Sequence, residues 1–208
     1  MVDLVLSAVL GYLLGSVPTG VVVCRLIRGV DVRRQGSGHT GGLNVTRTAG
    51  LPAGILTGAV DALLGAGAVA VASSLTDDPW AIMTAGVMAV IGHNWSVLIG
   101  FGGGIGISSL AGAMLCLSAG TTLAAAVILL AFWLLLVKPL RVHRARATIV
   151  VMALVGPLLW ALGGDSLGLQ GILLGVLGGV VVAVKTIPDW DRQYSQGRAR
   201  RPSEGEPG

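Results

Sequence analysis

The chain has 208 residues, of which 53% are hydrophobic and 12% are charged, and its formal net charge is +4. Soluble domains carry about 25% charged residues, so this composition excludes a chain whose surface faces mainly water. A membrane-spanning helix needs about 20 apolar residues, and the length therefore accommodates six or seven of them. We predict one membrane domain over residues 1–190 and a polar tail at 191–208, which we expect to be disordered.

The predicted spans follow one another as long apolar stretches joined by short polar connections. In chain order they are residues 4–24, 51–75, 79–99, 104–118, 120–137, 147–163 and 167–187. The first is interpreted as a retained span, because Asp3 is its only early charge and a signal peptide would begin with basic residues. The fourth is short and begins in a glycine cluster, so it could be tilted or partly re-entrant.

The positions of the basic residues predict the topology. All 14 Lys and Arg residues lie at 25–47, at 138–146 or in the C-terminal segment, whereas the other connections carry Asp77, Asp78 or Asp165. The positive-inside rule places the three basic segments in the cytoplasm. An even number of spans must separate the first two segments, and four fit. The sequence therefore predicts an all-α, polytopic membrane bundle of seven spans, with its N-terminus outside and its C-terminus cytoplasmic.

Two glycine-rich polar loops fall on the predicted cytoplasmic side. The first is Gly36–Gly50 (GSGHTGGLNVTRTAG), and the second begins at Gly92 and continues through Gly100–Gly106. Glycine lets backbone N–H groups approach a ligand closely, and a helix N-terminus adds unpaired donors and partial positive charge. Such settings commonly bind phosphate, for which Arg47 would add a planar fork of donors. Helix packing is the alternative use of glycine in membranes, but the polar residues among these glycines favour an anion site.

Asp, His and Cys residues inside or beside the predicted spans are the other side chains that can carry chemistry. Asp61 lies inside the second span, where an ionisable group is costly and is therefore a functional candidate, although it could equally be a structural partner. His93, at the end of the third span, is more often a packing or hydrogen-bonding residue than a catalyst. Cys24 and Cys116 are interpreted as small buried thiols, and the spacing of potential ligands predicts no metal site.

Together these motifs resemble those of the bacterial acyl-phosphate:glycerol-3-phosphate acyltransferases, small seven-span enzymes that start phospholipid synthesis. Gly15–Gly20 (GSVPTG) is similar to the first-span motif of that family, and Gly36–Gly50 is similar to its GSGNxGxTNxxRxxG loop. Asp61 falls where the family has an Asp, and Gly92–Gly112 resembles its GHxxP…GFKGGKGVATxxG segment. The motifs cover roughly the first 112 residues, and topology extends the resemblance over the rest.

The resemblance implies transfer of an acyl group from acyl phosphate to the 1-hydroxyl of glycerol 3-phosphate, giving 1-acylglycerol 3-phosphate and phosphate. It implies a multi-pass protein of the bacterial cell (inner) membrane in contact with lipid, with no cofactor and no nucleic-acid partner, and it leaves the oligomeric state open. The predicted catalytic residues are Ser37, Arg47 and His93. The predicted substrate-binding residues are Gly36, Gly38, Gly41, Gly42, Asn44, Asp61, Gly103, Gly104, Gly106 and Ser109.

The chain departs from the family pattern at several cationic positions. The family's KGGKG reads GGGIG at 102–106, a second-span Lys is replaced by Leu64, and the loop Asn is replaced by His39. The C-terminal His-Arg-Glu-Asn run is missing, and Lys185 stands near its place. Each lost charged hydrogen bond would weaken phosphate binding by roughly 1.5–3 kcal/mol, which His39 and Lys185 could offset in part. The alternatives are an acyltransferase with another acceptor, a non-catalytic relative that binds phospholipid or acyl phosphate, and a small transporter.

Overall fold

The computed structural model describes residues 1–192, and the regular secondary structure of this part is helical apart from one isolated bridge between Ser96 and Gly102. The predicted disordered tail thus falls, from residue 193 onward, outside the described residues. The helices are α1 (Val2–Gly15), α2 (Thr19–Arg28), α3 (Gly42–Ala49), α4 (Leu51–Leu75), α5 (Pro79–Asn94), α6 (Ile107–Leu117), α7 (Ala119–Val137) and α8 (Arg144–Thr186). Short 3-10 turns occupy Val32–Arg34, Val97–Ile99 and Ile187–Asp189.

Each predicted span overlaps a helical segment, but these segments differ in length and continuity. Five segments are long and apolar enough to cross a membrane: Val2–Arg28, Leu51–Leu75, Ala119–Val137, Arg144–Gly164 and Ser166–Asp189. The other two are α5, with 16 residues, and α6, a shorter apolar helix of 11 residues. The all-α membrane class is therefore confirmed, and the third predicted span, 79–99, ends as a helix at Asn94.

Two of the long segments are interrupted where the backbone cannot continue a regular helix. The first predicted span, 4–24, divides between α1 and α2 at Pro18, which lacks a backbone N–H and is the N-cap of α2. The long α8 folds back into two arms because Gly163 and Gly168 leave the helical region of φ/ψ space. The two arms of α8 thereby supply the sixth and seventh predicted spans.

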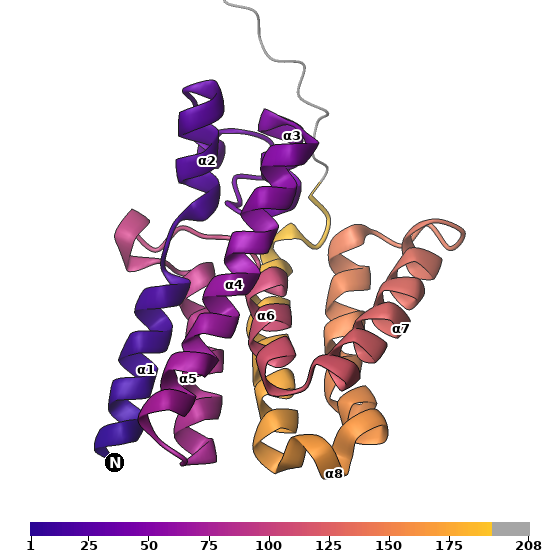
Figure 1. The fold of residues 1–208 in the computed structure, drawn as a ribbon. Helices are drawn as coiled ribbons and strands as arrows, with labels where there is room; N and C mark the ends of the chain where they lie inside the picture. Colours follow the sequence, from indigo (N-terminus) through magenta and orange to yellow (C-terminus); the bar gives the residue numbers. More distant parts are fainter. Residues whose placement is uncertain (193–208) are drawn as a thin grey trace, which may run out of the picture.

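The ends of the bundle differ in what they carry. In Figure 1, α2, α3, the α7–α8 connection and the end of α8 lie at the top, whereas the N-terminus and the α4–α5 connection lie at the bottom. The basic segments at 25–47 and 138–146 and the described part of the third, up to residue 192, therefore gather at one end of the bundle, as the charge pattern predicts. The two glycine-rich loops lie toward the same end (Figure 1).

Glycine lets neighbouring helices come into backbone contact. A Cβ on Gly15 of α1 would collide with the backbone of Ala89 in α5, and one on Gly112 of α6 would collide with the backbone of Ala62 in α4. Small residues at such crossings are typical of membrane helices. These crossings fix the height of α4 and α5 relative to their neighbours, and hence the positions of Asp61 and His93.

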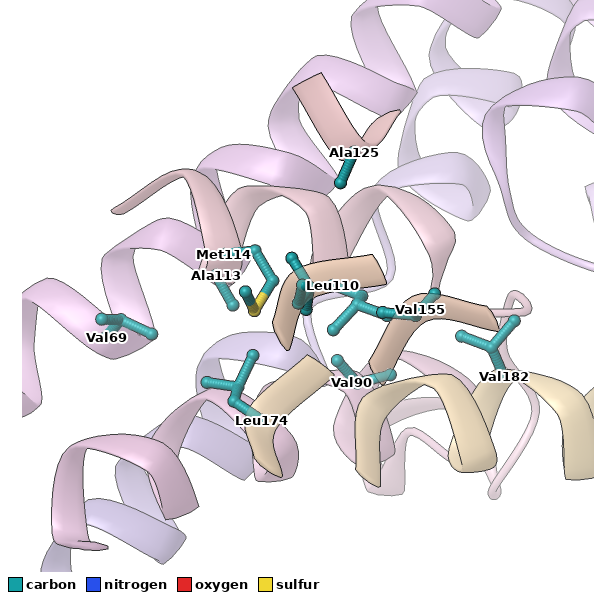
Figure 2. Packing of buried hydrophobic residues seen from close by; sticks show 10 residues of the cluster. Val69, Val90, Leu110, Ala113, Met114, Ala125, Val155, Leu174 and Val182 are labelled. Carbon is teal, nitrogen blue, oxygen red and sulfur yellow. The ribbon is translucent and has the colours of Figure 1, made fainter. Parts of the chain in front are cut away.

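The main apolar core joins α4, α5, α6 and both arms of α8 (Figure 2). Val69, Val90, Leu110, Val155 and Leu174 are buried there against one another. In contrast, α7 is mostly exposed and contributes Ala125 to the buried core. In Figure 1, α7 leans away from α6, and the side chains between these helices and α8 form the wall of a cavity.

Candidate active site

The two glycine-rich loops are joined by a backbone hydrogen bond, in which the N–H of Thr40 donates to the carbonyl of Gly103 at 3.3 Å. Within the second loop, the N–H of Gly104 donates to the carbonyl of His93 at 3.0 Å, and the N–H of Ser96 donates to the carbonyl of Gly102 at 2.9 Å. The loops predicted from the sequence to share a site therefore lie against each other.

The first loop is folded around the side-chain amide of Asn44. Its Nδ2 donates to the carbonyls of Val32, Gln35 and His39 at 3.2, 3.0 and 2.8 Å, and its Oδ1 accepts from the N–H of Ser37 at 3.2 Å. Asn44 is buried, and these bonds satisfy both ends of its amide. The Asn44 side chain therefore fixes the conformation of the loop. This structural role is additional to the substrate contact that the sequence predicts for Asn44.

Three glycines of this loop have positive φ angles, which side chains rarely adopt. The angles are 50° at Gly36, 78° at Gly38 and 96° at Gly50. A Cβ on Gly36 would also collide with Oδ1 of Asn44. Gly36 and Gly38 therefore serve the backbone turn that presents Ser37.

Asp61 and His93 meet in the interior of the bundle. His93 Nδ1 lies 3.7 Å from Asp61 Oδ1, and both side chains are buried. The contact brings together α4 and α5, and Gly104 lies against the other edge of the His93 ring. Asp61, whose carboxylate is energetically costly inside a membrane span, therefore faces the ionisable side chain of His93.

A cavity of about 590 Å³ connects these groups, and its size is in the usual range for small-molecule sites. Its wall includes eight of the predicted site residues: Ser37, Gly41, Gly42, Asn44, Arg47, Asp61, His93 and Gly106. The other five, Gly36, Gly38, Gly103, Gly104 and Ser109, are not among its lining residues in the described chain. Arg47 and the 105–106 segment thus share one cavity, as a common phosphate site requires.

The cavity has a polar end and an apolar end. The polar end also contains Ser108, Arg144, Thr186 and Asp189, none of which the sequence reasoning selected. The apolar end is lined from α6, α7 and α8 by Leu110, Ala111, Met114, Ala125, Ala126, Leu129, Leu130, Trp133, Val151, Met152, Val155 and Leu159. A ligand with an ionic head and an apolar chain matches this division.

Two helices begin at the polar end. The N-cap of α3 is Gly41 and that of α6 is Gly106, and neither cap makes a side-chain hydrogen bond within the described residues. Gly42, Ile107 and the two caps line the cavity. The first N–H groups of both helices and their partial positive charge are therefore directed to one region, which favours an anion there.

His39 and Lys185, the two residues that could replace the family's missing cations, differ in their position relative to the cavity. His39 lines the cavity, and its Nε2 lies 2.6 Å from Oδ2 of Asp189. Lys185 is not among the lining residues of the described chain, and its Nζ lies 4.9 Å from the ring centroid of Trp95, a cation–π distance. Of the two, the structure places His39 at the site.

A family model described as glycerol-3-phosphate acyltransferase matches residues 5–195, which is most of the chain. The chain belongs to the glycerol-3-phosphate acyltransferase family. It is 40% identical to the glycerol-3-phosphate acyltransferase of Synechococcus sp. (strain JA-3-3Ab), over 85% of this chain and 83% of the relative. The corresponding enzyme of Rubrobacter xylanophilus is 38% identical, over 86% of this chain and 85% of the relative.

Other comparisons are shorter or structural. Glycerol-3-phosphate acyltransferase 2 of Moorella thermoacetica is 43% identical over 113 residues, which are 54% of this chain and 58% of that relative. The fold is similar to the crystal structure of PlsY, an integral membrane glycerol 3-phosphate acyltransferase, in its glycerol 3-phosphate form. The TM-score is 0.75, with 26% identity and 89% of each chain covered. The family and this fold make the chain a membrane acyltransferase of phospholipid synthesis.

Proposed function

We propose that the protein transfers a fatty acyl group from an acyl phosphate to the 1-hydroxyl of glycerol 3-phosphate, producing 1-acylglycerol 3-phosphate and phosphate. The observation that supports this most directly is one cavity with a polar end and an apolar end. Both proposed substrates are phosphorylated, and one carries a chain that belongs in lipid. A cavity divided in this way accommodates both.

The phosphate groups bind at the polar end, between the N-termini of α3 and α6. Arg47, on the last turn of α3, supplies a guanidinium that matches phosphate oxygens. Ser37, held by Asn44, contacts the substrate at the same end. The acyl chain extends along α6, α7 and α8, so the reacting carbonyl lies between the two ends, near fixed N–H dipoles that stabilise charge developing on its oxygen.

The site faces the cytoplasm in this proposal. The described parts of the basic segments and both glycine-rich loops lie at the same end of the bundle (Figure 1), and the positive-inside rule places that end in the cytoplasm. The five long segments together with the shorter α5 and α6 then give seven spans, with the N-terminus outside. The membrane is the bacterial inner membrane, where a water-soluble acceptor reaches the site from the cytoplasm.

The test is an acyl-transfer assay on the purified full chain in detergent, with palmitoyl phosphate and glycerol 3-phosphate. We expect phosphate release and an equimolar lysophosphatidate product only when the acceptor is present. The protein should also restore growth to a strain that lacks its own glycerol-3-phosphate acyltransferase. Ligand-dependent thermal stabilisation without turnover on any phosphorylated polyol would contradict catalysis and identify a binding protein instead.

A further inference from the structure

His39 and Asp189 form a paired imidazole and carboxylate in the wall of the cavity. They are 150 residues apart in the sequence, and their Nε2 and Oδ2 atoms are 2.6 Å apart. The Asp189 side chain is 7% exposed and that of His39 is 21% exposed, so the carboxylate is the more buried partner. Arg192 Nη1 lies 3.4 Å from the other carboxylate oxygen of Asp189. The Asp189 carboxylate is therefore buried and held by Arg192, and the His39 imidazole lies in the cavity wall.

The backbone around His39 is held on both sides. Its carbonyl accepts a hydrogen bond from Asn44 Nδ2 at 2.8 Å, and the N–H of the next residue, Thr40, bonds to Gly103. Its own N–H donates to Ser37 Oγ at 3.4 Å, so the backbone of His39 is also bonded to a predicted catalytic residue. A side chain fixed through its backbone and through its ring is prepared to act at one position.

The contact with Asp189 also determines which ring nitrogen is available. A carboxylate accepts the Nε2–H, so the neutral imidazole carries its lone pair on Nδ1. No hydrogen bond to Nδ1 occurs among the described residues. The carboxylate would also stabilise the imidazolium once a proton has been accepted, which is the role of the acidic member in serine-hydrolase triads.

We propose that His39, oriented by Asp189, accepts the proton of the acceptor hydroxyl during acyl transfer. This inference rests on the proposed function. The hydroxyl oxygen attacks the acyl carbonyl carbon and forms the new C–O bond, while its proton moves to Nδ1 of His39. The bond from the carbonyl carbon to the phosphate oxygen then breaks, with its electron pair leaving on phosphate. His39 returns the proton to the phosphate or to water, and Asp189 stays ionised throughout.

The second histidine at the cavity is less suited to this task. His93 Nδ1 lies 3.7 Å from Asp61, beyond hydrogen-bond distance, and its ring is packed against Gly104.

The charged and titratable groups in the cavity wall around His39 come from several elements. They are Arg47 of α3, Asp61 of α4, His93 of α5, Arg144 of α8 and Asp189 of the last 3-10 turn, with Arg192 and Lys185 adjoining Asp189.

The test compares kcat, KM and the pH dependence of kcat/KM for the full chain and two variants, His39→Gln and Asp189→Asn. We expect His39→Gln to lower kcat at least about 100-fold, the usual contribution of a general base, with KM for glycerol 3-phosphate changed less than about 3-fold. The wild-type rate should fall toward acid pH. That acid limb should be absent in His39→Gln and should move to lower pH in Asp189→Asn, which loses the charge that favours the imidazolium.

The sign of the pH effect separates this role from phosphate binding by a protonated His39. A binding cation would raise KM when replaced, and the wild-type rate would rise toward acid pH. His143→Asn is the matched control, because His143 lies in the exposed α7–α8 connection and Asn can replace it as the N-cap of α8. We expect its kinetics to equal those of the wild type.

The outcomes are distinct. If the wild type transfers acyl groups and His39→Gln keeps its kcat and its acid limb, the proton-acceptor role is overturned and the proposed function stands. If His39→Gln does not fold, Asp189→Asn decides alone, and an unmoved acid limb overturns the role. If the wild type itself has no turnover, the proposed function fails and this role fails with it.

Discussion

Gly104 lies against the Nε2 edge of the His93 imidazole, so close that a Cβ at this position would collide with three ring atoms. The same glycine donates its N–H to the carbonyl of His93. The second glycine-rich loop is thus attached to the end of α5 by both backbone and side chain. Glycine is required there by the ring and not by an unusual φ angle, because Gly104 has no positive φ.

The substitution Gly104→Ala should therefore displace the His93 ring from its place beside Asp61. Overpacking of this kind costs about 1–3 kcal/mol, and we expect acyl-transfer activity to fall at least about 10-fold. Gly67→Ala is the control, because a Cβ on Gly67 in α4 meets no atom within 4 Å. Activity and thermal unfolding of both variants check this, and a fully active Gly104→Ala would show that the close contact is dispensable.

Arg47 should contribute to phosphate binding at the polar end of the cavity. A hydrogen bond to a charged group contributes roughly 1.5–3 kcal/mol, so Arg47→Ala should lower kcat/KM for glycerol 3-phosphate by about 10- to 150-fold. Arg47→Lys should recover only part of the loss, because an ammonium lacks the planar fork. The comparison is with Arg34→Ala, an exposed residue outside the cavity. Equal kinetics for Arg47→Ala and Arg34→Ala would exclude Arg47 from the site.

Ala125 should limit the length of the acyl chain. It is buried on α7, lines the apolar end of the cavity and leaves room that a larger side chain would fill. We expect Ala125→Phe to reduce the rate with a 16- or 18-carbon acyl phosphate at least about 5-fold relative to an 8-carbon donor, since each excluded CH₂ forfeits about 0.8 kcal/mol. The neighbouring Ala124 is exposed and lies outside the cavity wall, so Ala124→Phe should keep the wild-type chain-length profile.

Asp31 should make the stability of the loop region depend on acid pH. Hydrogen bonds from the Arg33 side chain hold the pKa of the Asp31 carboxyl well below its usual range, and Arg33 Nη1 also donates to the carbonyl of Ile99 at 3.1 Å. A carboxyl whose pKa is lowered by folding stabilises the folded state above its unfolded pKa of about 3.9, and this contribution is lost as pH falls further.

The measurement is thermal unfolding of wild type, Asp31→Asn and the exposed control Asp77→Asn between pH 7 and pH 3. We expect Asp31→Asn to unfold about 2–4 °C below the wild type at pH 7, which corresponds to about 1 kcal/mol. The difference should shrink as pH falls below about 4. A difference that is independent of pH would mean that the ion pair with Arg33 does not stabilise the fold.

Local patterns were enough to predict the helices and the end of the bundle at which the site lies. The apolar stretch predicted at 51–75 coincides with α4. An uninterrupted apolar segment of that length in a bilayer forms a helix, because a helix satisfies the backbone hydrogen bonds within the segment itself. The basic residues likewise predicted which connections gather at one end. The division of the first span at Pro18 was not predicted, although a proline that lacks a backbone N–H is a local signal for such a break. The short helix α3 inside the first glycine-rich loop was not predicted either.

The sequence by itself thus determined a polytopic helical membrane protein, its two glycine-rich loops and, through their motifs, its family. Only the tertiary structure decided which residues meet. The Thr40 N–H donates to the carbonyl of Gly103, and the Asn44 side-chain amide forms hydrogen bonds within its own loop. His39 pairs with the carboxylate of Asp189, 150 residues away in the sequence. Such contacts arise from how helices pack and where chain breaks direct the loops, which periodicity and composition do not encode. The shape of the cavity, and the His39–Asp189 pair in its wall, follow from that packing.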